Sequence, residues 1–386
     1  MLSLKKRRKN KMKILMLNYE FPPIGGGAAN AHRCLLQQYA RNSDLKIDVL
    51  TSAPKPGFVK ESFAENITIY KVGLHKKQLH YWRKTEVLEW LFKAGFYYRR
   101  LLRENDYDFA HAFSGFPTGW LPYRCSHKLP YIISLRGSDV PGEHARLKLD
   151  YKILGPAFRT IWKKASVLVA CSEGLKNRAL KFMPSVAIDV IPNGVDLERF
   201  SPTQTAPETQ NLRLLTVGRL SVTKRVEILI DAVDILSRQG CRILLKIVGG
   251  GQTRQKLKQI VNEKNLDNII EITGRIDAED MPRIYGQNDI FISASKLEGM
   301  SNAMLEAMAS GLPIIAARCE GTEELIAENG LVIENATAEE IAKAIKKLID
   351  DRQLRNQMSI AARKQAQQFT WGRIAEKYLN IYERVK

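Results

Sequence analysis

Short apolar runs alternate with helical patterns along both halves of the chain, and this alternation limits the fold more than any other feature. The apolar runs lie at 13–19, 46–52, 67–72, 108–113, 131–135 and 167–172, and then at 213–219, 243–251, 269–275, 290–295 and 313–317. Strands separated by helices predict a parallel sheet with helices on both faces. We therefore predict an α/β protein with two doubly wound, Rossmann-like domains in tandem. Ligands bind at the carboxyl ends of such strands, and two domains that face each other would form a cleft there.

A polar segment separates the two sets of strands. The segment "RFSPTQTAPETQN", residues 199–211, contains Pro and has no periodicity, so we predict a linker. The first domain is then residues 12–198, and the second is residues 212–368. Residues 369–386 have the spacing of an amphipathic helix, which we expect to pack across the domain junction.

Charge and cysteine usage limit the class of protein. The net charge is +19, and residues 1–200 carry 34 Lys and Arg against 17 Asp and Glu, whereas residues 201–386 carry 26 against 24. A basic first half suits nucleic acid, an anionic membrane or an anionic substrate. Five scattered cysteines without a CxxC pair predict reduced thiols in a cytoplasmic protein, and no metal site. No apolar run is long enough to span a membrane or to form a signal peptide, and Met12 is an alternative start.

Two loops that follow strands have the composition of a phosphate site. The loop "PPIGGGAA" places Gly25, Gly26 and Gly27 before a helix, where a glycine backbone lets a ligand approach closely. It does not match G-x-G-x-x-G, and a simple tight turn is the alternative. The loop "VGRLSVTKR" places Arg219 and Lys224 between a strand and a helix, where both cations reach a diphosphate. Solvated side chains are the alternative for this pair.

The stretch "SKLEGMSNAMLEAMASGLPIIA", residues 295–316, predicts a short helix between marked ends. Ser301 is suited to the N-cap, and Gly311 to the position after the last turn. Glu298 lies before the helix and Glu306 lies in its second turn. Both carboxylates can face a ligand at the helix start, where free N–H groups and the helix dipole favour an anion.

These elements, in this order, resemble glycosyltransferase family 4, whose members are retaining enzymes of the GT-B fold. The resemblance extends over nearly the whole chain and includes "IPNGVD" (191–196), "ITGRI" (272–276) and the closing "FTWGRIAEKYLNIY". Its most specific part is the pair of glutamates followed by "AMASGLPII". It implies transfer of a sugar from a nucleotide diphosphate sugar to a glycan or lipid-linked acceptor, in cell-surface polysaccharide, lipopolysaccharide or glycolipid synthesis.

The resemblance also implies roles on the donor side. Arg219 and Lys224 would bind the diphosphate and stabilise its charge as it leaves, Glu306 would accept hydrogen bonds from the ribose, and Glu298 would lie beside the donor sugar. No cofactor and no bound metal are implied, and "DYD" at 106–108 is the alternative metal motif. The remaining donor contacts would come from backbone N–H groups at Met300, Ser301 and Asn302, from Gly274 and Arg275 near the base, and from the loop Gly25–Gly27.

The acceptor side departs from the family pattern. In "SLRGSD", Arg136 stands where family members often carry His, and Asp139 is the candidate catalytic contact to the acceptor or sugar. His111 is either a sugar or acceptor contact in the cleft or a buried structural residue. No carboxylate nucleophile is evident in the first domain, so retention would follow the front-face route, in which the donor phosphate helps to deprotonate the acceptor.

The basic first half predicts a membrane partner. Residues 75–105 indicate a helix from about Thr85, and we predict that it docks on the cytoplasmic face of an anionic membrane. The alternative is a sheet-covering helix whose apolar side is core. The predicted apolar side is Leu88, Leu91, Phe92, Gly95, Phe96 and Leu102, with interfacial rings at Trp82, Trp90, Tyr97 and Tyr98.

Three rival hypotheses remain open. Another GT-B enzyme, such as a sugar-nucleotide epimerase or a phosphorylase, would share the fold, although no segment indicates a phosphorylase cofactor lysine. A non-catalytic sugar-nucleotide binder is the second, and intact Arg219, Lys224 and Glu298 argue against it. A basic nucleic-acid-binding protein is the third, but the sequence matches no such module.

Overall fold

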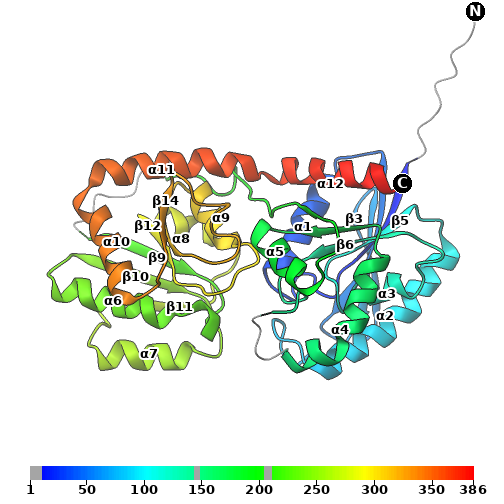
Figure 1. Cartoon of the computed structure of the whole chain (residues 1–386), viewed down its shortest axis with the longest axis horizontal. Coiled ribbons are helices and arrows are strands. Elements are labelled where there is room, and N and C mark those ends of the chain that lie inside the picture. Colours follow the sequence, from blue (N-terminus) through cyan, green and yellow to red (C-terminus); the bar gives the residue numbers. More distant parts are fainter. Residues whose placement is uncertain (1–10, 143–147, 204–210) are drawn as a thin grey trace, which may run out of the picture. The chain divides into compact units, whose positions relative to one another are not determined.

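The computed structural model describes residues 11–142, 148–203 and 211–386 and divides into two compact units (Figure 1). Unit 1 comprises residues 1–171, 175–191 and 374–386, and unit 2 comprises 172–174 and 192–373. The chain enters unit 2 at Pro192, ahead of the predicted linker. Asn193 and Val195 hold this segment in unit 2, because they bond to Asn302 and to the Phe369 carbonyl. Residues 204–210 of the predicted linker and the basic segment 1–10 lie outside the described residues.

The sheet of unit 1 runs in the order β3-β4-β2-β1-β5-β6-β7-β8, and the described pairs are parallel except β3 with β4. β1 lies inside the sheet, where fully buried Ile14 is in register with Ile47 of β2 and Phe109 of β5. The strands are β1 (Met12–Leu17), β2 (Leu45–Ala53), β3 (Phe58–Ala64), β4 (Ile67–Gly73), β5 (Phe109–Ala112), β6 (Tyr131–Leu135), β7 (Val167–Ala170) and β8 (Ile188–Val190).

Helices cover both faces of this sheet (Figure 1). α1 (Gly27–Tyr39) and the C-terminal helix α12 (Trp371–Val385) pack together, with the hydroxyls of Tyr39 and Tyr382 3.3 Å apart. Right-handed crossovers place α2 (Lys84–Glu104), α3 (Trp120–Tyr123) and α4 (Lys148–Lys164) on the opposite face. α5 (Glu173–Phe182) joins β7 to β8.

Unit 2 has a fully parallel sheet in the order β11-β10-β9-β12-β13-β14. This is the strand order of dinucleotide-binding domains, so the strand order reverses between β9 and β12. Its strands are β9 (Leu212–Val217), β10 (Ile243–Val248), β11 (Ile270–Gly274), β12 (Ile290–Ser293), β13 (Ile314–Ala317) and β14 (Gly330–Ile333).

The helices of unit 2 follow sequence signals at their ends and on their buried faces. α10 begins at Thr337, whose hydroxyl accepts the Glu340 N–H, and it buries Ile341, Ile345 and Leu348 at helical spacing. The helices are α6 (Val226–Arg238), α7 (Arg254–Glu263), α8 (Met281–Gly286), α9 (Asn302–Ala309), α10 (Ala338–Asp350) and α11 (Arg352–Ala366), with short 3₁₀ turns η2 (Val222–Lys224) and η3 (Gln367–Phe369).

Each predicted strand is present, with ends that shift by a few residues, whereas the apolar runs do not predict β3, β8 or β14. The predicted ends of α9 are confirmed: the Ser301 hydroxyl accepts the Met304 N–H, and Gly311 has a φ of +76°. Over the part of the chain that the structure describes, no helix is long and apolar enough to cross a bilayer.

Candidate functional site

A pocket lies at the carboxyl ends of β9 and β12, where the strand order of unit 2 reverses. Loops after these two strands bring Arg219 and Lys224 together with Ser301, the N-cap of α9. Ligands bind at such a point in open α/β sheets. The lining residues are Thr216, Val217, Gly218, Arg219, Leu220, Lys224, Val226, Val248, Phe291, Ser293, Ser295 and Ser301.

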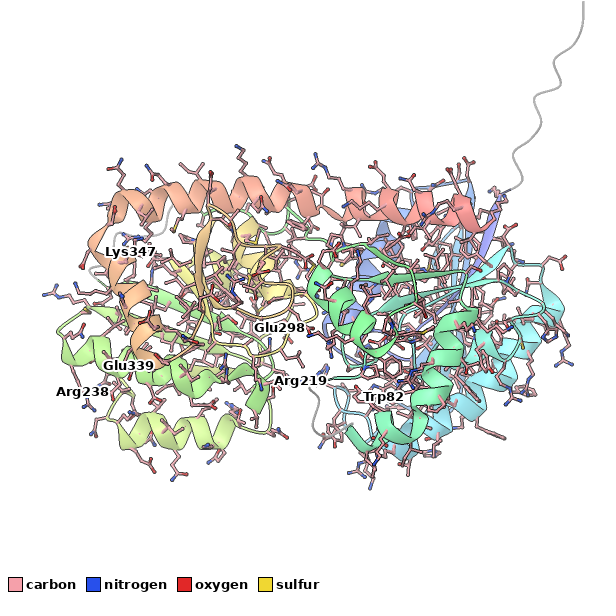
Figure 2. The ribbon with its side chains drawn as sticks, viewed as in Figure 1. Trp82, Arg219, Arg238, Glu298, Glu339 and Lys347 are labelled. Atoms are coloured by element: carbon pink, nitrogen blue, oxygen red, sulfur yellow. The ribbon has the colours of Figure 1, made fainter. Side chains whose placement is uncertain are left out.

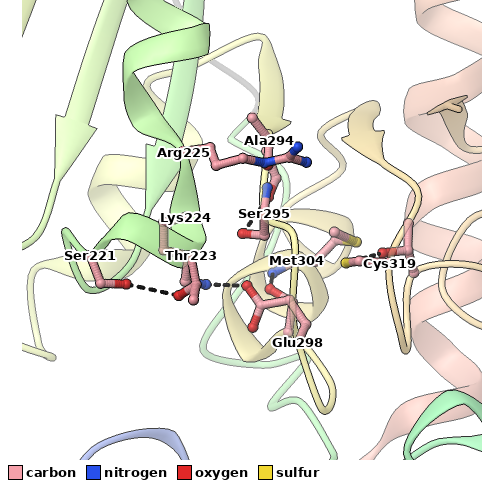
Figure 3. Close-up of polar contacts among 12 residues, drawn as sticks. Ser221, Thr223, Lys224, Arg225, Ala294, Ser295, Glu298, Met304 and Cys319 are labelled. Atoms are coloured by element: carbon pink, nitrogen blue, oxygen red, sulfur yellow. Dashed lines mark hydrogen bonds and ion pairs between the residues drawn. The ribbon is translucent and has the colours of Figure 1, made fainter. Parts of the chain in front are cut away.

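An ion pair joins the two loops at this pocket. Lys224, the last residue of η2, binds Glu298 Oε1, and both side chains are mostly buried (Figure 3). Two further contacts fix the loops: the Lys296 N–H donates to the Thr223 carbonyl at 2.8 Å, and Arg225 Nε donates to the Ala294 carbonyl at 2.7 Å. The structure therefore holds Lys224 and Glu298 in one place by backbone and side-chain contacts together.

Two arginines without a carboxylate partner stand at the same end of unit 2. Arg219 follows β9 and Arg275 follows β11, and both are exposed. Among the described residues, neither forms an ion pair, and burial together with the positive charge of Arg219 lowers the pKa of Arg275. Guanidinium groups that repel each other favour an anion between them. Figure 2 shows Arg219 and Glu298 at one end of unit 2 and Arg238, Glu339 and Lys347 at the other.

Gly249 lets the ends of three strands pack closely beneath this site. Its φ is +147°, and a Cβ at this position would lie 1.8 Å from the Gly218 carbonyl oxygen. Its N–H donates to the Gly274 carbonyl at 2.7 Å. Only glycine fits here. The three glycines of "VGGG" indicate this close approach in the sequence, although the apolar pattern alone assigned the run to a strand.

Glu306 faces a partner that the sequence does not reveal. The Tyr285 hydroxyl donates to Glu306 Oε2 at 2.8 Å. Burial raises the pKa of Glu306 to about 7, and this effect outweighs the opposing effects of Tyr285 and of the Arg199 charge. The carboxylate therefore changes its charge near neutral pH.

Asn193, from "IPNGVD", anchors the start of α9. Its Nδ2 donates to Asn302 Oδ1 at 2.8 Å, and its backbone N–H lies 3.0 Å from Met300 Sδ. The predicted backbone contacts at Met300, Ser301 and Asn302 thus belong to a turn that is held from a distant part of the sequence. The motif "IPNGVD" indicated Asn193 in the sequence, whereas no sequence pattern indicated Tyr285.

In unit 1, His111 lies in the interior of the fold. It is fully buried, Nδ1 lies 2.8 Å from the Tyr382 hydroxyl, and Nε2 lies 2.8 Å from Ser134 Oγ. Burial, with smaller effects from Arg136 and His32, lowers its pKa well below the usual value. Both ring nitrogens are engaged, which agrees with the structural alternative for His111. Its contact with a sugar or acceptor stays a prediction.

Asp139 shapes the backbone of unit 1. Its Oδ1 accepts the N–H groups of Arg136 and Gly137 at 2.8 and 2.9 Å, and its Oδ2 accepts the Gly115 N–H at 2.7 Å. The side chain is buried, and its bonds join the loops after β5 and β6, so Asp139 has a structural role. Its catalytic contact to the acceptor or sugar stays a prediction. Arg136 itself packs over the Phe113 ring, and its Nη2 donates to the Tyr378 hydroxyl at 3.2 Å.

The glycine loop of unit 1 forms the start of α1, with Gly26 at the N-cap. Gly25 has a φ of +98°, and its N–H donates to the Leu79 carbonyl at 2.9 Å. In "DYD", Asp108 Oδ2 accepts the Lys13 N–H at 2.7 Å. Within the described ranges, no three His, Cys, Asp or Glu side chains group as ligands for a metal ion.

Two family models match adjacent parts of the chain. "Glycosyltransferase Family 4" matches residues 25–199, and "Glycosyl transferases group 1" matches residues 198–365. An uncharacterised glycosyltransferase of Methanocaldococcus jannaschii is 26% identical, over 96% of this chain and 98% of that protein. The GDP-mannose-dependent alpha-(1-6)-phosphatidylinositol monomannoside mannosyltransferase of Mycobacterium tuberculosis is 26% identical, over 57% of this chain and 62% of that protein.

The fold is similar to that of solved glycosyltransferases. Sucrose-phosphate synthase from Thermosynechococcus elongatus superimposes with a TM-score of 0.83 at 21% identity, covering 97% of this chain and 99% of that one. The two family models together extend over both units, and the fold agrees with them. The chain has the GT-B fold and belongs to the family 4 glycosyltransferases.

Proposed function

We propose that the protein transfers a hexose from a nucleotide diphosphate sugar to a glycan or lipid-linked acceptor, with retention of configuration at C1. The product would belong to a cell-surface polysaccharide, lipopolysaccharide or glycolipid. The observation that carries this proposal is the convergence of Arg219, Lys224 and the start of α9 on the pocket of unit 2. The GDP-mannose dependence of the mycobacterial relative supports a nucleotide-sugar donor.

Charge compensation of the leaving group is the main task of this site. When the bond between C1 and the phosphate oxygen breaks, negative charge develops on the departing nucleoside diphosphate. Arg219 and Lys224 would receive that charge, together with the N–H groups and dipole at the start of α9. One such donor is typically worth about 3 kcal/mol of transition-state stabilisation. Because fixed cations supply this compensation, we propose that turnover needs no metal ion or other cofactor, and activity in excess EDTA tests this.

The two glutamates would bind different parts of the donor. Glu298, held by Lys224, would accept a hydrogen bond from a sugar hydroxyl, and Glu306 would accept one from the ribose. Arg275 and the backbone at Gly274 would frame the base. The new bond forms between the acceptor oxygen and C1 on the face from which the diphosphate leaves. The acceptor proton passes to the leaving phosphate oxygen, so no protein nucleophile is required.

The reaction would take place at an anionic membrane surface, with the protein bound peripherally on the cytoplasmic face. The excess of Lys and Arg in residues 1–200 supports this location. A lipid-linked acceptor would be presented there.

The experiment compares binding with turnover. A thermal shift with UDP, GDP, ADP and TDP identifies the base, because a bound nucleotide raises the unfolding temperature. The matching sugar nucleotides are then incubated with the protein, and release of nucleoside diphosphate is measured. Slow release of nucleoside diphosphate without acceptor is the expected result, and when an acceptor is added the glycoside should keep the configuration of the donor at C1. An isomerised donor without release of nucleoside diphosphate would indicate an epimerase. Release of sugar that depends on added phosphate would indicate a phosphorylase. Nucleotide binding without any turnover would indicate a non-catalytic binder.

A further inference from the structure

Helix α2 has a second apolar face that is directed away from the core of unit 1. Leu88, Phe92 and Phe96 recur every fourth residue and are 65%, 84% and 58% exposed. We call these three residues the α2 stripe. Exposed aromatic side chains at helical spacing mark a surface that is covered in function.

The helical spacing predicts a broader apolar side, with Trp90 and Tyr98 at a membrane interface, and this position of the two rings is wrong. Trp90 and Tyr98 are 0% and 1% exposed and pack in the core with Ala94 and Leu101. The helix therefore covers the sheet with one face and leaves the α2 stripe free among the described residues. The sheet-covering alternative for residues 75–105 holds for the buried face, and membrane docking of the exposed face stays a prediction.

Helix α4 extends this apolar surface. Leu149 and Ile153 are 64% and 66% exposed and lie one turn apart. Lys84 Nζ lies 2.7 Å from Asp150 Oδ1, so the first turns of α2 and α4 are adjacent (Figure 1). The α2 stripe and these two residues form one surface of unit 1, which we call the α2–α4 face.

Positive charge predominates on the two helices of the α2–α4 face. Helices α2 and α4 carry ten Lys and Arg against four Asp and Glu. Some are paired on the surface, as Lys93 is with Glu89 and Arg100 is with Glu104. Lys84 lies at one end of the α2 stripe, and exposed Arg99 and Arg103 lie at the other.

A pocket opens beside the α2 stripe, between α2 and α3. Its lining includes Leu91, Gly95, Tyr98, Arg99, Trp120 and Arg124. The Tyr98 hydroxyl is buried and has no hydrogen-bond partner among the described residues. A buried hydroxyl without a partner is costly. The guanidinium groups of Arg99 and Arg124 suit a phosphate group.

We propose that the α2–α4 face docks on an anionic lipid bilayer, with the α2 stripe inserted at the headgroup boundary and the Arg99–Arg124 pocket around a lipid phosphate. A bilayer offers apolar surface and negative charge together. A second copy of this face would instead place positive charge against positive charge. The inference rests on the membrane location in the proposed function, and lipid-free donor hydrolysis separates the two.

The test is co-sedimentation with phosphatidylcholine vesicles that contain or lack phosphatidylglycerol. We expect binding to the anionic vesicles, at least fivefold less to neutral ones, and a decrease with salt. Replacing Leu88, Phe92 and Phe96 by Ser should lower binding at least tenfold. Arg99→Gln with Arg124→Gln should lower it at least threefold and remove the preference for anionic lipid. The matched controls are Ile360→Ser, 72% exposed on α11, and Lys343→Gln with Lys347→Gln on α10.

Every variant is checked for an unchanged unfolding temperature and unchanged lipid-free donor hydrolysis. Wild-type binding with loss only in the α2 and arginine variants supports the proposal, even if no sugar transfer is found. Absence of wild-type binding at low salt, or equal loss in the controls, overturns it. A dimer that the α2 stripe variant dissociates in analytical ultracentrifugation would assign the face to a second copy and also overturn it.

Discussion

Each unit has a doubly wound parallel sheet, but the carboxyl ends of the strands are used differently in the two units. In unit 1 the polar groups at this edge satisfy one another: Asp139 accepts three backbone N–H groups, and His111 bonds to Ser134 and Tyr382. In unit 2 the described residues give Arg219 and Arg275 no carboxylate partner, and Arg219 lines a pocket. The comparison teaches that a polar residue in such a loop is not evidence of function by itself. The edge with uncompensated charge is the better candidate for binding a charged ligand.

The units also differ in the groups that titrate. All six histidines lie within residues 1–171, and unit 2 has none. Among the described residues of unit 2, Glu306 of α9 has a pKa near neutrality. Acid should therefore destabilise unit 1 through buried histidines, whereas pH near neutrality should act on unit 2 through Glu306.

The largest effect is expected for the cations of unit 2. Arg219→Ala and Lys224→Ala should each lower kcat roughly 100-fold with little change in KM, since each removes about 3 kcal/mol of stabilisation that is specific to the departing diphosphate. Steady-state kinetics on the donor identified above measures this. Lys347→Ala, at the opposite end of unit 2, is the control and should leave kcat unchanged (Figure 2). A double variant that turns over within a few fold of wild type would remove both residues from the mechanism.

The second prediction concerns acid unfolding of unit 1. Burial, and to a smaller extent Arg136, lower the pKa of His32 to about 3, and the pKa of His111 is also well below its usual value. Well below pH 6.5, unfolding therefore takes up about two protons, so stability falls as pH drops, by about 2.4 kcal/mol between pH 6 and pH 5. Tryptophan fluorescence reports on this unit, because four of the five tryptophans lie in it.

The control for this prediction removes one of the two groups. His32→Gln should reduce the slope by about half, since one proton fewer is taken up on unfolding. A slope that does not change would mean that other groups, such as carboxylates, cause the acid sensitivity.

The third prediction tests whether Asp139 has a structural role or a catalytic role. Asp139→Asn should destabilise unit 1 by about 2 kcal/mol, because hydrogen bonds to a charged acceptor are lost or weakened and the side chain is buried. Urea unfolding followed by tryptophan fluorescence measures this, with exposed Asp106→Asn as the control. A large loss of kcat at unchanged stability would indicate that Asp139 has a catalytic role.

The smallest effect is the pH dependence of nucleotide binding. The raised pKa of Glu306 means that its protonated form stabilises unit 2 at low pH, and that this stability is lost as pH rises through about 7. A ribose hydroxyl needs the ionised carboxylate as acceptor. Nucleotide affinity, relative to Glu306→Gln at each pH, should therefore rise by close to tenfold from pH 6 to pH 8. A constant ratio across this range would show that Glu306 does not accept from the ligand.

Much of the fold could be predicted from the sequence because buried parallel strands are continuous apolar runs. β3 was not predicted because it is an edge strand with exposed or half-buried side chains. β8 was not predicted because it has three residues. The ends of α9 were predicted because capping depends on neighbours in the sequence.

The pocket residues of unit 2 could also be predicted, since spacing and order place Arg219, Lys224 and Glu298 at strand ends. The contacts of the candidate residues in unit 1 could not be predicted. The Tyr382 hydroxyl bonds to His111 although the two residues are 271 positions apart in the sequence. No local pattern therefore shows that the His111 ring already has a partner. Tyr285 was missed for the same reason, because only the fold brings it to Glu306.

The central claim is that the pocket of unit 2 binds the nucleoside diphosphate of the donor, with the two glutamates dividing the contacts. Titration calorimetry with the nucleoside diphosphate selected by thermal shift tests it most directly. Glu306→Gln should weaken binding roughly tenfold to a hundredfold, as expected for loss of about 1.5–3 kcal/mol at a charged acceptor. Glu298→Gln should leave binding within about threefold, because this ligand carries no sugar. Equal losses in the two variants, or unchanged binding in Glu306→Gln, would contradict the account.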